Sequence, residues 1–116
     1  MMKKNKFHAQ KVEFNGRTYD SKKEAKRAGI LEQQERLGII TGLRKQVEFT
    51  LQPAYVNNQG KKIREITYVA DFVYEKDGKL YVEDVKGSKR TLTEAYKIKR
   101  KIFEYKYPGY IFVENI

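Results

Sequence analysis

Two short segments carry the side chains best suited to chemistry. The first, residues 81–87, reads YVEDVKG and places Asp84 two residues before Lys86. Side chains of a strand alternate between its faces, so Asp84 and Lys86 project on one side and Glu83 on the other. A carboxylate can bind a divalent cation, and a nearby ammonium can orient or deprotonate an attacking water. This combination suits metal-assisted phosphodiester hydrolysis. Gly87 then lets the backbone turn away and leaves room for a phosphate.

A second carboxylate lies in an apolar setting. Asp71 is the only charged residue in the run 66–74. An acid embedded in this way costs free energy unless it is paired or bound to a cation. A hairpin closed by the turn at residues 77–78 brings position 71 opposite 83 or 84. We therefore expect Asp71 and Asp84 to share one site, or Glu83 to take the place of Asp84 if the register is shifted by one.

The cation at such a site would have to be a hard one. The chain has no Cys and a single His, at position 8, so oxygen ligands must form the site. Oxygen ligands favour Mg²⁺ or Mn²⁺ over zinc. Two simpler interpretations stay open. Asp84 and Lys86 can form an exposed ion pair, and Asp71 can pair with Arg64 or Lys79.

The net charge of +10 on 116 residues is unevenly distributed. Residues 1–27 carry nine Lys and Arg against three acids, residues 86–106 carry eight against two, and residues 28–85 carry eight against nine. Two basic segments therefore flank the stretch that holds most of the acids. A polyanionic partner such as DNA explains this arrangement, because each neutralised phosphate releases counterions. Solvated lysines on a basic soluble protein are the simpler alternative.

Composition predicts one small domain. The apolar share of 40 %, with nine Tyr and six Phe, is enough for one core. We expect a basic N-terminal arm over residues 1–10 and a single domain over residues 11–116. No window approaches 18 uninterrupted apolar residues and no secretory segment is recognisable. We therefore expect a cytoplasmic protein with no membrane partner, and no feature indicates a small-molecule substrate.

The N-terminal half contains clear start and stop signals. An Asn-Gly pair at 15–16 predicts a short hairpin over residues 11–19. Ser21 and Glu24 have the spacing of a capping box and predict a helix that stops at Gly38. From residue 43 the period changes to two, which predicts a strand with one face formed by Leu43, Val47, Phe49 and Leu51.

The remaining elements complete an α/β (α+β) fold. Strands are expected at 54–56, 62–75, 79–86 and 110–113. A second capping box, Thr91 and Glu94, predicts a helix that runs to about residue 105. The expected architecture is a mixed central sheet flanked by helices.

The candidate residues and this order of elements resemble the PD-(D/E)XK nuclease superfamily. The resemblance rests on a helix with Glu24, the lone strand Asp71, the run DVKG at 84–87 and a basic helix after it. The superfamily core is restriction-endonuclease-like, with the order α-β-β-β-α-β. More narrowly, YDSKKEA at 19–25, YVADF at 68–72 and VEDVKG at 82–87 resemble a small phage-encoded group. That group is related to the endonuclease I type of Holliday (four-way) junction resolvase. Ala70 departs from the pattern, since the superfamily's name has proline there.

The resemblance implies a role for each residue. Asp71 and Asp84 are implied as metal ligands, the carbonyl of Val85 as a third ligand, and Lys86 as the catalytic lysine. Glu24 is implied as an outer or second-metal carboxylate, although a capping-box glutamate needs no catalytic explanation and both interpretations stay open. The implied cofactor is Mg²⁺ (or Mn²⁺). A homodimer is expected, because symmetric cutting of a junction requires two active sites. A phage-encoded member would act in the host cell cytoplasm.

Basic residues near these segments are the candidate phosphate contacts. They lie in the first turn of the first helix, just after the Asp84 strand, and on the second helix: Lys22, Lys23, Lys89, Arg90, Lys97, Arg100 and Lys101. The simpler interpretation of the second helix is a solvated basic side opposite a core face of Tyr96, Ile98, Ile102 and Phe103.

The leading hypothesis is a metal-dependent endodeoxyribonuclease, with a preference for branched DNA implied by the resemblance alone. One alternative is a non-catalytic DNA- or RNA-binding module with an inert sheet. Another is a small interaction protein whose charge only keeps it soluble. Asp71 favours the nuclease, because a protein that only binds phosphates gains nothing from carboxylates in its sheet.

Overall fold

The computed structural model describes residues 11–14 and 16–116, so the expected basic arm over residues 1–10 lies outside the described residues. The elements along the chain are β1 (Val12–Phe14), β2 (Arg17–Tyr19), α1 (Lys22–Arg36), β3 (Thr41–Gln52), β4 (Tyr55–Val56), β5 (Lys62–Ile63), β6 (Ile66–Lys76), β7 (Lys79–Val85), a 3₁₀ turn (Lys89–Thr91), α2 (Glu94–Lys106) and β8 (Tyr110–Asn115).

The central sheet has four strands in the order β3-β6-β7-β8. β3, β6 and β7 pair antiparallel, and β8 pairs parallel to β7 after the α2 crossover. The predicted fold class is confirmed: a mixed sheet flanked by helices, with elements in the order α-β-β-β-α-β. Among the described residues, no helix is long and apolar enough to cross a membrane.

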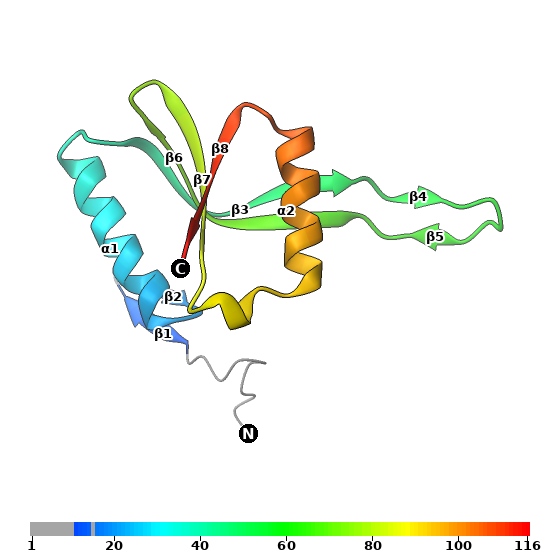
Figure 1. Cartoon of the computed structure of the whole chain (residues 1–116), viewed down its shortest axis with the longest axis horizontal. Helices are drawn as coiled ribbons and strands as arrows, with labels where there is room; N and C mark the ends of the chain where they lie inside the picture. Colours follow the sequence, from blue (N-terminus) through cyan, green and yellow to red (C-terminus); the bar gives the residue numbers. More distant parts are fainter. Residues whose placement is uncertain (1–10, 15) are drawn as a thin grey trace.

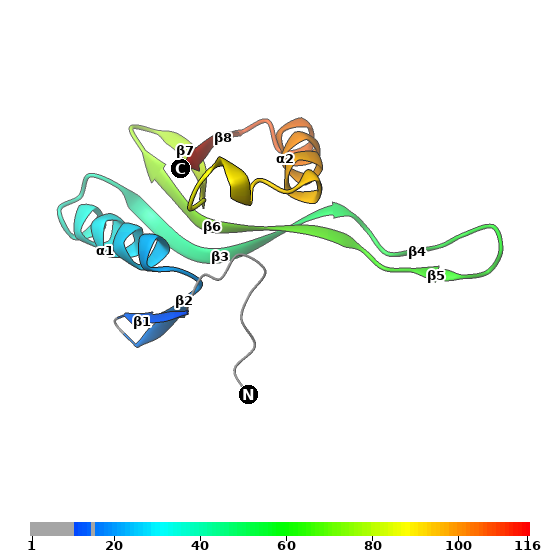
Figure 2. The same cartoon turned by 60° about the horizontal axis from the view of Figure 1, so that its bottom comes forward.

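The helices cover opposite faces of the sheet (Figures 1 and 2). On the α2 face, Phe103 and Tyr96 pack with apolar residues of β3 and β6, and edge-to-face aromatic pairs such as Phe49–Phe103 fill the space. On the α1 face, Ala25, Ala28 and Leu31 pack against the sheet. Two separate cores result, one on each face of the sheet, and strands of the sheet contribute residues to both.

The strands change face at one point, and this corrects the expected pattern for β3. Leu43 packs into the α1 core, whereas Val47, Phe49 and Leu51 belong to the α2 core, so the four do not share one face. The backbone around these residues is irregular: the β3–β6 register shifts between Thr41 and Arg44, and Gln46 has a φ of +52°. That conformation is uncommon for a residue with a side chain, and irregularities of this kind change which face the following side chains occupy. In β6, Ala70 and Phe72 likewise lie in different cores, with Asp71 between them.

β3 and β6 continue beyond the sheet as the β4–β5 hairpin, which projects away from both helices (Figure 1). The expected strand 62–75 is therefore two strands, interrupted at residues 64–65.

The first helix cap is as predicted and the second is not. Ser21 Oγ accepts a hydrogen bond from the N–H of Glu24 (3.1 Å), which is one half of a capping box, while the Glu24 carboxylate accepts from the N–H of Asp20 and not from that of Ser21. For α2 the expected cap at Thr91 is wrong. Thr93 caps the helix, its Oγ1 accepting from the N–H of Tyr96 (3.1 Å), while Thr91 ends a 3₁₀ turn.

Candidate active site

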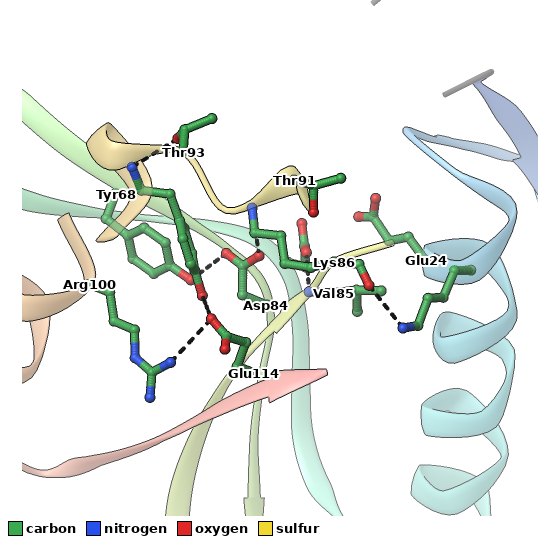
Figure 3. A network of polar contacts seen from close by, with 12 residues as sticks. Glu24, Tyr68, Asp84, Val85, Lys86, Thr91, Thr93, Arg100 and Glu114 are labelled. Atoms are coloured by element: carbon green, nitrogen blue, oxygen red, sulfur yellow. Dashed lines mark hydrogen bonds and ion pairs between the residues drawn. The ribbon is translucent and has the colours of Figure 1, made fainter. Parts of the chain in front are cut away.

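Asp84 lies near the end of β7 and is held from two sides. It is 4 % exposed. The Tyr68 hydroxyl donates to its Oδ2 at 2.7 Å, and Lys86 Nζ lies 3.1 Å from its Oδ1 (Figure 3). Asp84 and Lys86 therefore share a face, as the alternation predicted.

Asp71 reaches the same place from the neighbouring strand. The β6–β7 register pairs Phe72 with Glu83, which puts Asp71 level with Asp84. The backbone N–H of Val85 donates to Asp71 Oδ2 at 2.7 Å. In the described part of the chain Asp71 has no ion pair, so the alternative pairing with Arg64 or Lys79 is not present.

Glu24 approaches from the first turn of α1. It is 4 % exposed, and its Oε2 accepts from the N–H of Asp20 at 3.3 Å. Its Oε1 accepts from Gln46 Nε2 at 2.8 Å, and the same amide lies 3.3 Å from Asp71 Oδ1. Glu24 is therefore both a capping residue and part of the carboxylate group, with Gln46 as the bridge between α1 and β6.

Lys86 is positioned by its surroundings. Its ammonium lies 4.1 Å from the centre of the Tyr96 ring, a cation–π contact. Its backbone N–H donates to the Asn115 carbonyl at 2.7 Å, and its carbonyl accepts from Lys23 Nζ at 2.9 Å. β8 and α1 therefore both hold the main chain from which this side chain extends.

The three carboxylates have raised pKa values. Burial, reinforced by the charges of Asp84 and Glu24, raises the pKa of Asp71 to about 8. Burial and the charge of Asp20 raise the pKa of Glu24. The pKa of Asp84 is raised by burial, although Lys86 and Tyr68 oppose the shift. The protein therefore disfavours the charged form of each of these carboxylates, and a bound cation would favour it.

Glu83 faces the other way, as the sequence predicted. It is fully buried and accepts from Arg27 at 2.6 and 2.9 Å, from the Tyr74 hydroxyl at 2.8 Å and from Asn115 at 3.1 Å. Although burial alone would raise it, these bonds lower the pKa of Glu83. The register that places Asp84 in the site is therefore the one observed.

These groups open into a hollow of about 700 Å³ between α1, the sheet and the segment after β7. Glu24, Gln46, Asp71 and Asp84 line it, together with Lys86, Gly87 and Ser88. A phosphate ester can therefore reach the carboxylates and the lysine from solvent.

The donor set fits a hard divalent cation in part. Asp71 and Asp84 supply carboxylate oxygens, and Val85, whose N–H donates to Asp71, lines the same hollow. Within the described residues, no three acidic or histidine side chains form a complete metal cluster. A cation would therefore use two carboxylates with main-chain or water oxygens, and Lys86 would have to release Asp84 Oδ1.

The predicted phosphate contacts fall into three groups. Lys22, Lys89 and Arg90 are exposed, and each is next in the chain to a residue that lines the hollow, namely Ser21, Ser88 and Thr91. Lys23 is directed to the Lys86 carbonyl. On α2, Lys97 pairs with Glu94 (3.4 Å), Arg100 pairs with Glu104 (3.0 Å) and Glu114 (3.2 Å), and Lys101 is exposed.

The expected core face of α2 is partly wrong. Tyr96 and Phe103 are buried and Ile102 is partly buried, but Ile98 is 55 % exposed. Tyr96 and Phe103 are seven residues apart, so the positions between them on the buried side are Lys99 and Arg100. Both of these cations are half-buried.

Sequence reasoning missed three residues of the site: Gln46, Tyr68 and Tyr96. Gln46 occupies a polar position of an alternating strand, and only cross-strand pairing brings it to Asp71. Tyr68 and Tyr96 look like core aromatics, and both also serve as partners of Asp84 or Lys86. Tyr68 lies within β6 and Tyr96 within α2, where a buried tyrosine is expected to pack, so the sequence carries no sign of this second role.

One model of a protein family, described as "Protein of unknown function (DUF1064)", matches residues 4–113. The chain matches no curated protein and no solved structure. The chemistry of the site therefore rests on its own residues.

Proposed function

Because the chain belongs to the DUF1064 family, whose description assigns no activity, we propose a function from the site: a metal-dependent endonuclease that hydrolyses phosphodiester bonds in DNA. The observation that carries the proposal is the convergence of Asp71, Asp84 and Lys86 at one solvent-accessible hollow. The pKa values of these two carboxylates are raised, whereas the pKa of Glu83, on the other face of the same strand, is lowered.

Each residue of the site has a definite part in this proposal. Asp71 and Asp84 would hold Mg²⁺ or Mn²⁺ together with the Val85 main chain. When bound, the cation supplies charge stabilisation for the phosphate and an acidified water. Lys86 lies beside Asp84, where its ammonium can stabilise negative charge that develops on a phosphate oxygen. Glu24 is connected to Asp71 through the Gln46 amide and would serve as a carboxylate outside the set of direct metal ligands.

The surroundings of the site favour a polyanionic substrate. Lys22, Lys89 and Arg90 are exposed near the hollow, and the whole chain carries a net charge of +10. Gly87 offers an open approach, since no atom of the described residues lies within 4 Å of where a Cβ would stand. A phosphate backbone can therefore come close to the main chain at Gly87, between the side chains of Lys86 and Ser88.

The finer parts of the proposal come from the resemblance to junction-resolving endonucleases. We propose branched DNA, such as a four-way junction, as the substrate and a homodimer as the acting form, in the cytoplasm of the cell where the DNA is cut. Two active sites related by symmetry suit two symmetric cuts.

The experiment is nicking of supercoiled plasmid in the presence of Mg²⁺ or Mn²⁺, with EDTA as the control. We expect cation-dependent nicking that Asp84→Asn abolishes. Plasmid that stays intact under all conditions would overturn the nuclease proposal. Cleavage of a labelled four-way junction beside a duplex of the same sequence then tests the substrate, and equal rates on both would overturn the preference for branched DNA.

A further inference from the structure

A second hollow lies on the far side of the Asp84–Lys86 pair. It has a volume of about 330 Å³ and lies between the start of α2 and β6. Asp84, Lys86 and Val69 line this hollow and also the first one. The two hollows are therefore neighbouring parts of one groove that meet at the proposed reaction centre, with Val69, 44 % exposed, on the wall between them.

Among the described residues that line the second hollow, several are donors and Asp84 is the one acid. Lys99 and the hydroxyl-bearing residues Thr67 and Thr93 line it. Thr93 Oγ1 accepts from the N–H of Tyr96, so the hydroxyl proton of Thr93 remains able to donate. An ammonium and hydroxyls at one end of a groove suit a phosphate group.

Lys99 differs from the other cations of α2. Lys97 and Arg100 are engaged by acids, and Lys101 lines neither hollow. Lys99 lines the second hollow and has no ion pair within residues 11–14 and 16–116. Of these four cations, Lys99 is therefore the one that lines the second hollow and has no ion pair among the described residues.

We propose that the second hollow is the subsite for the phosphate next to the one that is cut, with Lys99 as its charged contact. This proposal rests on the proposed nuclease function, because it takes the phosphate beside Lys86 as the one whose ester bond is cut. It also revises the expected contacts on α2, since Lys99 replaces Lys97, Arg100 and Lys101 in that role. In this arrangement the bound DNA strand passes from residues 86–88 over Val69 towards α2.

The first test measures binding of duplex DNA by the metal-free protein at several salt concentrations. Lys99→Gln should reduce the slope of log affinity against log salt by about 0.9, the value for one lost phosphate contact. Lys79→Gln is the matched control, because Lys79 is an exposed lysine at the turn between β6 and β7. We expect its slope to equal that of the unchanged protein. An unaltered slope for Lys99→Gln, or an equal loss for Lys101→Gln, would overturn the assignment.

The second test locates the phosphate. Single methylphosphonates, which remove one charge, are placed at successive positions on either side of a mapped cleavage site. If Lys99 contacts the adjacent phosphate, one of these substitutions should weaken wild-type cleavage at low substrate, and Lys99→Gln should add nothing to that loss. Additive losses at every position would overturn the subsite.

The two proposals fail in different ways. Binding that depends on Lys99 without any cation-dependent cleavage would overturn the nuclease function and keep a phosphate subsite. Cleavage that is indifferent to Lys99 would overturn the subsite alone. A protein that binds no DNA would overturn both.

Discussion

Glu83 and Asp84 are neighbours on β7, and both are buried. Glu83 projects to the α1 face and receives four hydrogen bonds, two of them from the guanidinium of Arg27. Asp84 projects to the other face, where Tyr68 and Lys86 are its partners and a hollow lies beside it. The pKa is lowered for the first carboxylate and raised for the second.

The difference separates a carboxylate that stabilises the fold from one that is available for chemistry. The carboxylate of Glu83 on β7 accepts hydrogen bonds from Arg27 of α1 and Asn115 of β8, and so links the three elements. Burial raises the pKa values of Asp84 and Asp71 although Lys86 opposes both shifts, so an external cation would further favour their charged forms. Two adjacent carboxylates, Glu83 and Asp84, are therefore expected to have different consequences when changed.

The largest effect is expected on the Asp84 side. Asp84→Asn and Lys86→Ala should each lower the cleavage rate by about 10²–10³. Asparagine keeps the size of the side chain and can still accept from Tyr68, so the fold should remain. Rates are compared under single turnover, with thermal unfolding as the control. Wild-type cleavage by either variant would mean that the Asp84–Lys86 face is not the reaction centre.

Glu83→Gln should act on stability instead. The substitution leaves the Arg27 guanidinium partly buried without its counter-charge, and breaking a buried ion pair in this way costs about 3 kcal/mol or more. Urea unfolding measures the loss. At low temperature, where the variant is folded, its cleavage rate should stay far above that of Asp84→Asn. The reverse order of the two rates would show that Glu83 has the catalytic role.

The electrostatic contrast predicts a smaller, pH-dependent effect. Asp71 has a pKa of about 8 in the folded protein and 3.8 as its ordinary value, so the folded chain binds the proton more tightly. The resulting stability is present at low pH and is lost as pH rises through about 8. The metal-free protein should therefore unfold at a lower temperature at pH 8 than at pH 6.

Asp71→Asn is the matching variant for this comparison. It stays neutral, so the difference between pH 6 and pH 8 should shrink. Mg²⁺ at pH 8 should stabilise the unchanged protein and not the variant, because a cation that binds only the folded state raises its stability. An identical response of both proteins to pH and to Mg²⁺ would remove Asp71 from the cation site.

Much of the fold could be predicted because its signals are local. The Ser21 cap, the turn at 77–78 and the alternation in β7 each depend on a few adjacent residues, and the structure confirms all three. The alternation also gave the opposite faces of Glu83 and Asp84.

The errors arose where a distant partner decides the outcome. The change of face at Gln46 depends on its left-handed backbone, and its amide bridges Glu24 and Asp71 across three elements. The sequence of β3 alone gives no sign of this. On α2, charged residues were expected to face solvent, but Arg100 covers the Phe112 ring and pairs with Glu114 of β8. That partner is supplied only by the parallel pairing of β8.

The smallest expected effect concerns the ring beneath Lys86. Tyr96 contributes two separable interactions, the ring face under the ammonium and a hydroxyl that donates to Glu114 at 2.9 Å. Tyr96→Phe keeps the ring and should cleave within about twofold of the unchanged protein. Tyr96→Leu removes the ring and should slow cleavage roughly tenfold at saturating substrate, the scale of one cation–π contact. Because Tyr96 is also a core residue, thermal unfolding must accompany the rates. Equal rates for the two variants at a temperature where both are folded would mean that Asp84 alone positions Lys86.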